Sequence, residues 1–329
     1  MRSSRITLAS RPDGPVSLDN FATDEVELPA LDAGEVLIDV EYLSIDPTIR
    51  GWMSYDTYLP KIGVGEVIRS AGAGRVTESR NDRFPVGSRV FGMPGWQTRA
   101  IMRGGVPIPE GVSYEDALSV FGITGLTAYV GLEDIGKPAE GETFVVSGAA
   151  GGVGSIAGQI AKIRGSRVVG IAGSPEKCRW VVDDLGFDEC IDYRAESIAD
   201  GLRRTCPDGI DVYFDNVGGE TLNEVLARIN DHARIVLCGA ISQYNSAQPE
   251  PGPANIVNAI SRRALLQGFI ILDHMDRGAE ATAQMAQWIA DGRLTSRTYV
   301  LEGLESAPTA LMQLFTGDNL GKTLVHLSA

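Results

Sequence analysis

Cysteine and histidine are scarce in this chain, and its first 177 residues contain neither. A zinc site built from that part would lack both imidazole and thiolate ligands, so we predict no metal site. The rest of the chain holds all of these residues: Cys178, Cys190, Cys206, Cys238, His232, His274 and His326. No two cysteines have the CxxC spacing, which argues against disulfides and against a four-cysteine zinc knot. We expect each histidine to be an ordinary surface or half-buried residue rather than a catalyst.

Basic residues and long apolar runs are also few. Lysine and arginine number 29 against 43 acidic residues, so the net charge is −14. That charge argues against nucleic acid or an anionic membrane surface as the main partner. The sequence has no run of about 18 apolar residues, and its first residues, MRSSRITLAS, lack the apolar core of a signal peptide. We therefore expect a soluble, cytoplasmic protein whose 329 residues form two domains.

The most informative segment is residues 143–177, which predict a strand, a glycine turn, a helix, a second strand and then a basic residue. The first strand is β-branched or aromatic throughout, as expected of a parallel strand buried on both faces. The glycines that follow permit a tight turn and a close approach to pyrophosphate; they are Gly148, Gly151, Gly152 and Gly154. A helix beginning near Val153 would direct its N–H groups at the anion, with Gly158 holding it close to the sheet.

The glycine pattern by itself leaves two interpretations open. It is AxGxxG, at Ala149, Gly151 and Gly154, in place of GxGxxG. Turns of ordinary α/β proteins use the same residues, so the pattern alone is weak. The flanking strands favour the alternative, a dinucleotide-binding turn.

The residues after the second strand, 167–172, indicate which dinucleotide is bound. An NAD enzyme usually has Asp or Glu about 20 residues past the glycines, to bind the ribose hydroxyls. Here Gly173 and Ser174 lie at that place and Lys177 follows. A small hydroxyl and a nearby cation suit a 2′-phosphate, which favours NADPH over NADH. The alternative is that Lys177 and Arg179 are solvated helix residues and that Glu176 is the ribose-binding acid.

The pattern along the chain predicts an α/β protein with two parts. Short strands separated by Gly, Pro and Asp indicate a small, largely antiparallel β domain before residue 118; we expect them at 35–42, 65–70, 75–77, 89–91 and 98–102. Apolar strands then alternate with helices, as in a doubly wound parallel sheet, with strands expected at 143–147, 167–172, 189–193, 211–216, 234–238 and 266–272. Two further strands, 298–301 and 323–327, could complete the first domain. The boundaries that follow are 1–118 with 297–329 for one domain and 119–296 for the other.

One proline-rich segment, QYNSAQPEPGPA at 243–254, follows the fifth of these parallel strands. It could hang over the carboxyl ends of the sheet, where ligands bind in this architecture, or be a plain solvent loop.

Several motifs in order resemble the zinc-independent branch of the medium-chain dehydrogenase/reductases. The motifs are SIDPTIRG (44–51), GEVIRSAGAGRV (65–76), GITGLTAYVGLEDIGKPAEGET (122–143), FDNVGGE (214–220), LCGAISQYN (237–245), QGFI (267–270) and GDNLGK (317–322). The most similar groups are the leukotriene 12-hydroxydehydrogenase / prostaglandin reductases, the alkenal double-bond reductases and the curcumin-reductase-like enzymes. The resemblance implies a Rossmann NADP-binding domain inserted in a GroES-like, mostly β, substrate domain. It also implies a homodimer.

The resemblance further implies a set of cofactor-binding residues. It places the pyrophosphate at Gly152 to Ser155 and the 2′-phosphate at Lys177 and Tyr193; Lys177 also follows from charge and spacing. The full set that we predict is Thr127, Gly151, Gly152, Val153, Gly154, Ser155, Ser174, Lys177, Tyr193, Asn216, Cys238, Gly239, Ala240, Ile241, Ser242, Phe269, Ile270 and Asn319.

Two tyrosines are the candidate catalytic residues. Enzymes of this family reduce the carbon–carbon double bond of an enone or enal, and this chemistry needs a hydrogen-bond donor where enolate charge develops. Tyr244 in LCGAISQYN is the candidate donor, because a phenol donates while neutral at pH 7; alternatively it packs against the nicotinamide. Tyr58 resembles a family tyrosine near the substrate entrance, or it is a hydrophobic anchor of a surface loop. Thr48 and Trp52 depart from the family's DPYMRGRM, which leaves substrate size and shape open.

The resemblance therefore implies NADPH-dependent reduction of α,β-unsaturated ketones or aldehydes by hydride transfer to the β-carbon. Two alternatives are an NADPH quinone oxidoreductase and a non-enzymatic NADPH-binding protein. The expected partner is a small enone or enal.

Overall fold

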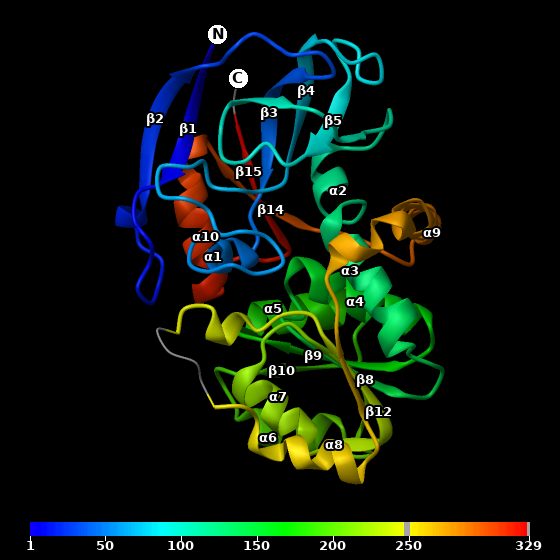
Figure 1. Cartoon of the computed structure of the whole chain (residues 1–329). Helices are drawn as coiled ribbons and strands as arrows, with labels where there is room; N and C mark the ends of the chain where they lie inside the picture. The colour runs from blue at the N-terminus through cyan, green and yellow to red at the C-terminus, as the bar shows by residue number, and fades with distance from the viewer. Residues whose placement is uncertain (247–250, 328–329) are drawn as a thin grey trace. The chain divides into compact units, whose positions relative to one another are not determined.

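A computed structural model describes residues 1–246 and 251–327 of the chain (Figure 1). The chain divides into two compact units, Met1–Leu118 with Thr298–Ala329 and Ser119–Arg297. Across these described ranges, no helix has both the length and the apolar character needed to cross a membrane. Residues 247–250 of the proline-rich segment lie outside the described residues, so its expected position over the sheet stays a prediction.

The first unit is built around a mostly antiparallel seven-stranded sheet with the order β14-β15-β3-β4-β5-β7 and β6 paired to β3. Its strands are β3 (Val36–Ser44), β4 (Gly72–Ser79), β5 (Arg89–Gly92), β6 (Arg99–Met102), β7 (Val106–Pro107), β14 (Thr298–Glu302) and β15 (Lys322–His326). The carboxyl-terminal strand β15 joins the sheet by pairing antiparallel with β3, Leu324 opposite Ser44. Strands from before and after the second unit therefore share one sheet.

A separate hairpin joins β1 (Arg2–Leu8) to β2 (Phe21–Glu27), with Arg2 opposite Glu27 and Leu8 opposite Phe21. The sequence did not predict it. Ile6 and Leu8 of β1 are buried in the core of the unit beside Ile38, Leu43 and Trp96. Three helices complete the unit: α1 (Thr48–Trp52), α2 (Tyr114–Leu118) and α10 (Ala307–Thr316).

The strand expected at residues 65–70 is wrong. This segment makes only an isolated bridge, between Val67 and Thr7. Its backbone bonds to β1 instead, because Ile68 N donates to Ile6 O and Leu8 N donates to Glu66 O, both within 3.0 Å. Gly65, at φ 88°, breaks the extended conformation at the start of the segment. An irregular stretch thus replaces the expected strand.

The second unit holds a six-stranded parallel sheet in the order β10-β9-β8-β11-β12-β13. The strands are β8 (Thr143–Ser147), β9 (Arg167–Ala172), β10 (Glu189–Asp192), β11 (Ile210–Asp215), β12 (Ile229–Leu237) and β13 (Leu265–Gly268). Numbered from β8, this is the 3-2-1-4-5-6 order of a Rossmann sheet. The predicted fold class, a doubly wound parallel sheet with a mostly β partner, is confirmed.

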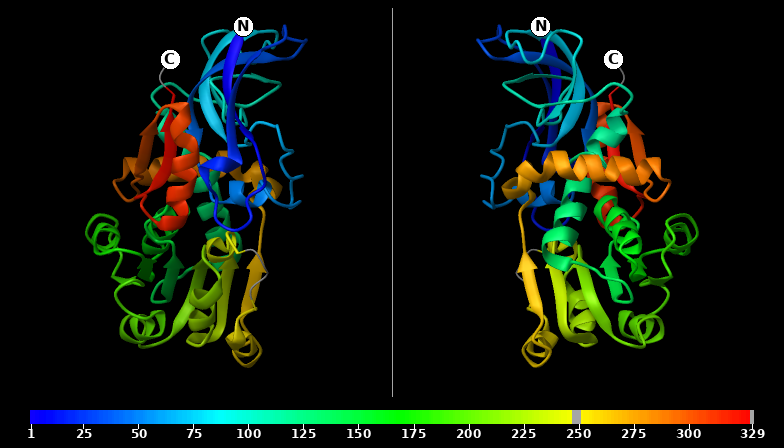
Figure 2. Two further views of the ribbon diagram at one scale, coloured as in Figure 1. Left: turned by 90° about the vertical axis from the view of Figure 1, so that its left-hand side faces the viewer. Right: turned by 90° about the vertical axis from the view of Figure 1, so that its right-hand side faces the viewer.

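Helices cover both faces of this sheet, and Figure 1 shows α6 and α7 on one face and α3 and α4 on the other. The helices are α3 (Ile123–Val130), α4 (Gly152–Ile163), α5 (Pro175–Arg179), α6 (Ile198–Thr205), α7 (Gly219–Leu226), α8 (Val257–Ser261) and α9 (Gly278–Ala290). Leu202 of α6 and Val225 of α7 are fully buried against Val145 and Ile171 of the sheet. Figure 2 shows β13, in orange-yellow, at the edge of the sheet.

The expected last strand of the sheet, 266–272, is too long. β13 ends at Gly268, and residues 271–277 form 3₁₀ turns on either side of a kink at His274 instead. Asp273 N donates to Ile270 O at 3.0 Å and closes the turn that leads the chain away from the sheet.

Candidate functional site

The predicted cofactor residues of the second unit gather at the carboxyl ends of its parallel strands. Each of the six strands ends just before one of them, and parallel strands end at one edge of a sheet. After β8 come Gly151 to Ser155, after β9 Ser174 and Lys177, after β10 Tyr193, after β11 Asn216, after β12 Cys238 to Ser242, and after β13 Phe269 and Ile270. This edge is the place where α/β sheets of this type bind ligands.

The turn after β8 has the shape that a phosphate requires. Gly148 adopts φ 61°, and Gly151 N donates to Gly148 O at 2.9 Å. A Cβ at Gly154 would lie 2.3 Å from Gly148 O, so a side chain cannot be accommodated there. α4 begins at Gly152, one residue before the predicted start, and the N–H groups of its first turn provide the donors and the positive dipole end. The turn fits a pyrophosphate.

Two residues of α4, Ser155 and Gly158, serve the structure of this region. The Ser155 hydroxyl is buried and donates to Gly152 O at 3.2 Å, and its backbone N–H donates to Gly151 O at 3.1 Å. A Cβ at Gly158 would lie 1.9 Å from the ring of Phe187. Gly158 therefore allows α4 its close approach, as predicted, through contact with the segment that precedes β10.

The loops after β9 and β10 bring three predicted 2′-phosphate residues together. Ser174 caps α5, where its Oγ accepts from Lys177 N at 3.2 Å. The Tyr193 hydroxyl faces Gly173, because a Cβ at Gly173 would lie 2.5 Å from it. Tyr193 is 50% exposed and so is a surface residue, available to a ligand. Lys177 is half-buried, whereas Arg179 and Glu176 are exposed.

The loop after β11 is held by a buried polar network that sequence reasoning missed. Asp215 Oδ1 accepts from four donors: the hydroxyls of Tyr213 (2.8 Å) and Ser147 (3.3 Å) and the backbone N–H groups of Val217 (3.0 Å) and Gly218 (2.8 Å). Burial raises the pKa of the Asp215 carboxyl above its ordinary value. The motif FDNVGGE contained the signal for this residue, but Ser147 and Tyr213 come from two different strands.

The same network positions Asn216. Its backbone N–H donates to Ser147 Oγ at 3.0 Å, and its side-chain Nδ2 donates to Ser147 O at 2.7 Å. Asn216 is therefore clamped between the ends of β8 and β11, beside the glycine turn.

The loop after β12 rests on the loop after β11. Cys238 N and Gly239 N both donate to Asp215 O, at 2.9 and 3.0 Å, and Ser242 Oγ donates to Val217 O at 2.6 Å. Burial raises the pKa of the Cys238 thiol to about 12, so the thiol stays protonated at neutral pH and is a poor nucleophile. The N–H groups of all five residues from Cys238 to Ser242 are bonded within these two loops, which fixes the course of the backbone.

Tyr244 lies at the end of this loop. Its hydroxyl oxygen accepts a hydrogen bond from Ala240 N at 3.2 Å. A phenol that accepts a hydrogen bond is the stronger donor through its own O–H. The contact holds the ring against the 238–242 backbone, close to Gly239.

The other predicted residues of this unit are Phe269, Ile270 and Thr127. Phe269 and Ile270 are half-buried beyond the end of β13, and the Phe269 ring lies edge-on to His274 with centroids 6.3 Å apart. The Thr127 hydroxyl donates to Ile123 O at 2.7 Å, within its own helix α3. The role of Thr127 at the cofactor stays a prediction.

Asn319 and Tyr58 belong to the first unit. Asn319 is buried, and its Nδ2 donates to Gly321 O at 3.1 Å. Tyr58 is 44% exposed, and its hydroxyl lies 3.3 Å from Thr48 Oγ1. Its ring stands edge-on to the buried Trp52, with centroids 6.2 Å apart. Tyr58 and Thr48 therefore interact on the segment that departs from the family's sequence.

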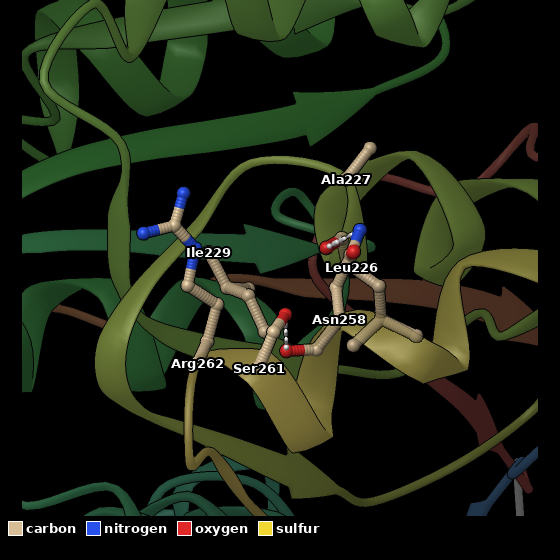
Figure 3. Close-up of a pocket in the computed structure, with 6 residues that line it drawn as sticks. All are labelled: Leu226, Ala227, Ile229, Asn258, Ser261 and Arg262. Atoms are coloured by element: carbon tan, nitrogen blue, oxygen red, sulfur yellow. Dashed lines mark hydrogen bonds between the residues drawn. The ribbon is translucent and has the colours of Figure 1, made fainter.

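A surface hollow of about 280 Å³ lies at the opposite end of β12 (Figure 3). It is lined by Leu226, Ala227, Ile229, Asn258, Ser261 and Arg262. Ile229 is the first residue of β12, so this hollow is away from the carboxyl edge of the sheet. None of the predicted site residues lines it.

No group of three or more His, Cys, Asp or Glu side chains within residues 1–246 and 251–327 is arranged to hold a metal ion. Together, the sheet order, the glycine turn and the loops at the carboxyl edge define a dinucleotide-binding protein of the Rossmann class.

Comparisons with known proteins agree with this class. Residues 4–108 match the family model described as the N-terminal domain of oxidoreductase, and residues 152–291 match zinc-binding dehydrogenase. The NADPH-dependent curcumin reductase of Escherichia coli (strain K12) is 40% identical over 338 residues, covering 99% of this chain and 97% of the relative. Mouse prostaglandin reductase 1 is 40% identical over 328 residues, covering 97% of each. The crystal structure of CurA from Vibrio vulnificus in complex with NADPH superposes with a TM-score of 0.95 at 43% identity, covering 99% of each chain.

The chain belongs to the medium-chain dehydrogenase/reductase family, in its zinc-independent, curcumin-reductase-like branch. The family predicted from the sequence motifs is thereby confirmed.

Proposed function

We propose that this protein is an NADPH-dependent reductase of the carbon–carbon double bond of α,β-unsaturated ketones or aldehydes. One observation carries the proposal: the carboxyl edge of the sheet joins a glycine turn that fits pyrophosphate to a segment after β9 in which Gly173 and Ser174 stand at the usual place of the acid and Lys177 follows. Two relatives, an NADPH-dependent curcumin reductase and a prostaglandin reductase 1, support the same chemistry.

In this proposal the cofactor lies along the loops that follow the strands. The N–H groups at the start of α4 bind pyrophosphate, and Lys177 with Tyr193 binds the 2′-phosphate. Asn216 and the 238–242 backbone bind the ribose and nicotinamide side. The bound nicotinamide supplies the hydride.

The protein contributes positioning and a hydrogen bond to the reaction. Tyr244 donates to the carbonyl oxygen of the substrate as enolate charge develops, which stabilises the transition state more than the ground state. The Ala240 N–H holds its oxygen at 3.2 Å and so fixes the phenol. Tyr58, with Thr48 and Trp52, contributes to the substrate wall of the first unit.

The test is an activity panel in which the purified chain receives enones, alkenals and quinones under one NADPH condition. We expect oxidation of NADPH with enones or alkenals, with the saturated carbonyl compound as product. Turnover of quinones alone would replace the proposal with quinone reduction, and NADPH binding without turnover of any compound would indicate a binding protein.

We further propose a homodimer that forms along β13. Apolar side chains are exposed on this edge strand and on the helical residues before it: Leu265 on β13, Val257 and Ile260 on α8, and Ile256 directly before α8. Ile260 is 79% exposed, which is unusual for an isoleucine without a partner. An Ile260→Asp variant should run as a monomer in analytical ultracentrifugation while the wild type runs as a dimer; equal masses for the two would contradict the proposal.

We also propose that the protein works in the cytoplasm. The described cysteines are all free thiols, which suits a reducing compartment where NADPH is available.

A further inference from the structure

Two cysteines touch directly behind the loops that are proposed to hold the 2′-phosphate. The sulfurs of Cys178 on α5 and Cys190 on β10 lie 2.8 Å apart, and both side chains are half-buried. α5 packs against β10, so backbone contact supports the pair.

Each cysteine is close in sequence to a proposed 2′-phosphate residue. Cys178 follows Lys177 on α5, and Cys190 precedes Tyr193 by three residues at the end of β10. Cys178 N also donates to Ser174 O at 3.0 Å, which ties it to the capping residue of the same helix. The proposed subsite has two walls: α5 with Ser174 and Lys177, and the end of β10 with Tyr193. A disulfide between the two sulfurs would join these walls covalently.

We infer that Cys178 and Cys190 form a reversible redox modification site that controls the affinity of the protein for NADPH. This inference rests on the proposed function for its effect on the cofactor. The sequence argues against permanent structural disulfides. That argument does not apply to a disulfide that forms only under oxidation.

The pair is chemically asymmetric. The Cys190 thiol donates its hydrogen bond to the sulfur of Cys178. This hydrogen bond lowers the pKa of Cys178 below its ordinary value, whereas the same bond and burial raise the pKa of Cys190. Cys178 is therefore the nucleophile, and Cys190 is the resolving thiol.

The oxidant is a hydroperoxide, and the reaction balances in two steps. The Cys178 thiolate attacks one oxygen of the peroxide, so an S–O bond forms and the O–O bond breaks. Cys178 becomes a sulfenic acid, and hydroxide leaves and takes up a proton to give water. Cys190 then attacks the sulfur of Cys178, the S–S bond forms, and the S–O bond breaks with release of water. Two thiols are oxidised, and one hydrogen peroxide is reduced to two waters. A dithiol reverses the reaction by exchange.

Closing the pair changes the geometry of the subsite. The sulfurs must move from 2.8 Å to a bond of about 2.0 Å, which draws α5 toward β10. Lys177 and Ser174 move with α5, while Tyr193 stays with β10. A phosphate that needs both walls then binds less well.

The other two cysteines are unsuited to this reaction. Cys206 is 1% exposed, and burial raises its pKa. Burial likewise holds the thiol of Cys238 in its protonated form. Cys206→Ala is the matched control, because Cys206 lies in the core of the second unit, away from the proposed site.

The experiment treats the full-length protein with stoichiometric hydrogen peroxide, blocks free thiols with N-ethylmaleimide and maps the peptides by mass spectrometry. We expect a cross-link between the peptides of Cys178 and Cys190 in the wild type and in Cys206→Ala, reversed by dithiothreitol. We expect none in Cys178→Ser or Cys190→Ser, whose melting temperatures report whether they fold. Absence of the cross-link in the oxidised wild type would overturn the inference.

The second readout is NADPH affinity, measured by cofactor fluorescence. Oxidation should raise the Kd for NADPH of the wild type roughly five- to tenfold, with a smaller change for NADH, and should leave Cys178→Ser unchanged. A cross-linked protein with unchanged NADPH affinity would overturn the control of binding. Failure of the reduced protein to bind NADPH would contradict the proposed function instead, and the peptide map would still decide whether the thiol pair reacts.

Discussion

Ser147 and Asn216 join the ends of two neighbouring parallel strands through two hydrogen bonds, from Asn216 N to Ser147 Oγ and from Asn216 Nδ2 to Ser147 O. Ser147 ends β8 and Asn216 follows β11, so the pair spans 69 positions in sequence. It sits between the glycine turn and the loop after β12. This pair of hydrogen bonds, the Ser147–Asn216 clamp, therefore sets the spacing of the loops at which we place the cofactor.

Removal of the Ser147 hydroxyl should destabilise the protein. Ser147→Ala leaves Asn216 N without its acceptor and takes one donor from the buried Asp215, so we expect a loss of about 1–3 kcal/mol in the free energy of unfolding. Urea unfolding checks this value. Ser261→Ala is the control, because its hydroxyl is exposed on α8, and it should change stability by about 0.5 kcal/mol or less. Equal stability of the two variants would contradict the role of the clamp.

The pH dependence of stability should reveal the buried Asp215. Its pKa in the folded state is raised by burial, so the folded protein holds this proton more tightly than the unfolded chain does. The stabilisation that this proton provides is fully present below the pKa of Asp in the unfolded chain, about 3.9. It is lost as the pH rises through the pKa of Asp215 in the folded protein. Asp215→Asn keeps an acceptor at Oδ1 for the four donors and removes the titration.

We therefore expect the stability of Asp215→Asn relative to wild type to increase as the pH rises above about 4. Urea unfolding at several pH values measures this difference. A difference that is the same at every pH would show that Asp215 titrates alike in the folded and unfolded states.

The choice between NADPH and NADH should depend on Lys177. Lys177→Ala removes a charge-assisted hydrogen bond to the 2′-phosphate, which is worth about 1.5–3 kcal/mol, and should raise the KM for NADPH roughly 10- to 100-fold. The KM for NADH should change little, because NADH has no 2′-phosphate.

Arg179→Ala is the matched control for Lys177→Ala. Arg179 lies two residues further along α5 and is exposed, so its loss should leave both constants near the wild-type values. Parallel changes in the two cofactors for Lys177→Ala would favour the solvated-lysine interpretation of this segment.

Tyr244 should affect turnover more than cofactor binding. Tyr244→Phe removes the proposed donor to the substrate carbonyl, and we expect kcat with an enone to fall on the order of 100-fold. The variant also loses the hydrogen bond from Ala240 N, so the Kd for NADPH is measured alongside. Unchanged turnover would leave Tyr244 as a packing residue; the same measurements on Tyr58→Phe test the other candidate tyrosine.

The fold class and the family could be read from the sequence because their signals are local. The apolar run of β8, the glycines after it and the alternation of strands and helices each occupy one continuous segment. The strand expected at 65–70 was wrong because its apolar residues pair irregularly with Ile6 and Leu8, which lie far away in sequence. The hairpin β1–β2 was missed for the same reason, since its partners are separated by a long loop.

Some residues of the site could likewise be predicted from the sequence, and others could not. Lys177 follows from charge and spacing, and Tyr193 and Tyr244 from resemblance; their roles stay predictions. The sequence by itself determined the fold class, the family and the absence of Cys and His from the first 177 residues. Only the tertiary structure decided that Ser147, Tyr213 and Asp215 meet, and that Cys178 touches Cys190. The order of strands in a parallel sheet brings these residues together, and that order depends on the packing of the whole sheet rather than on any one segment.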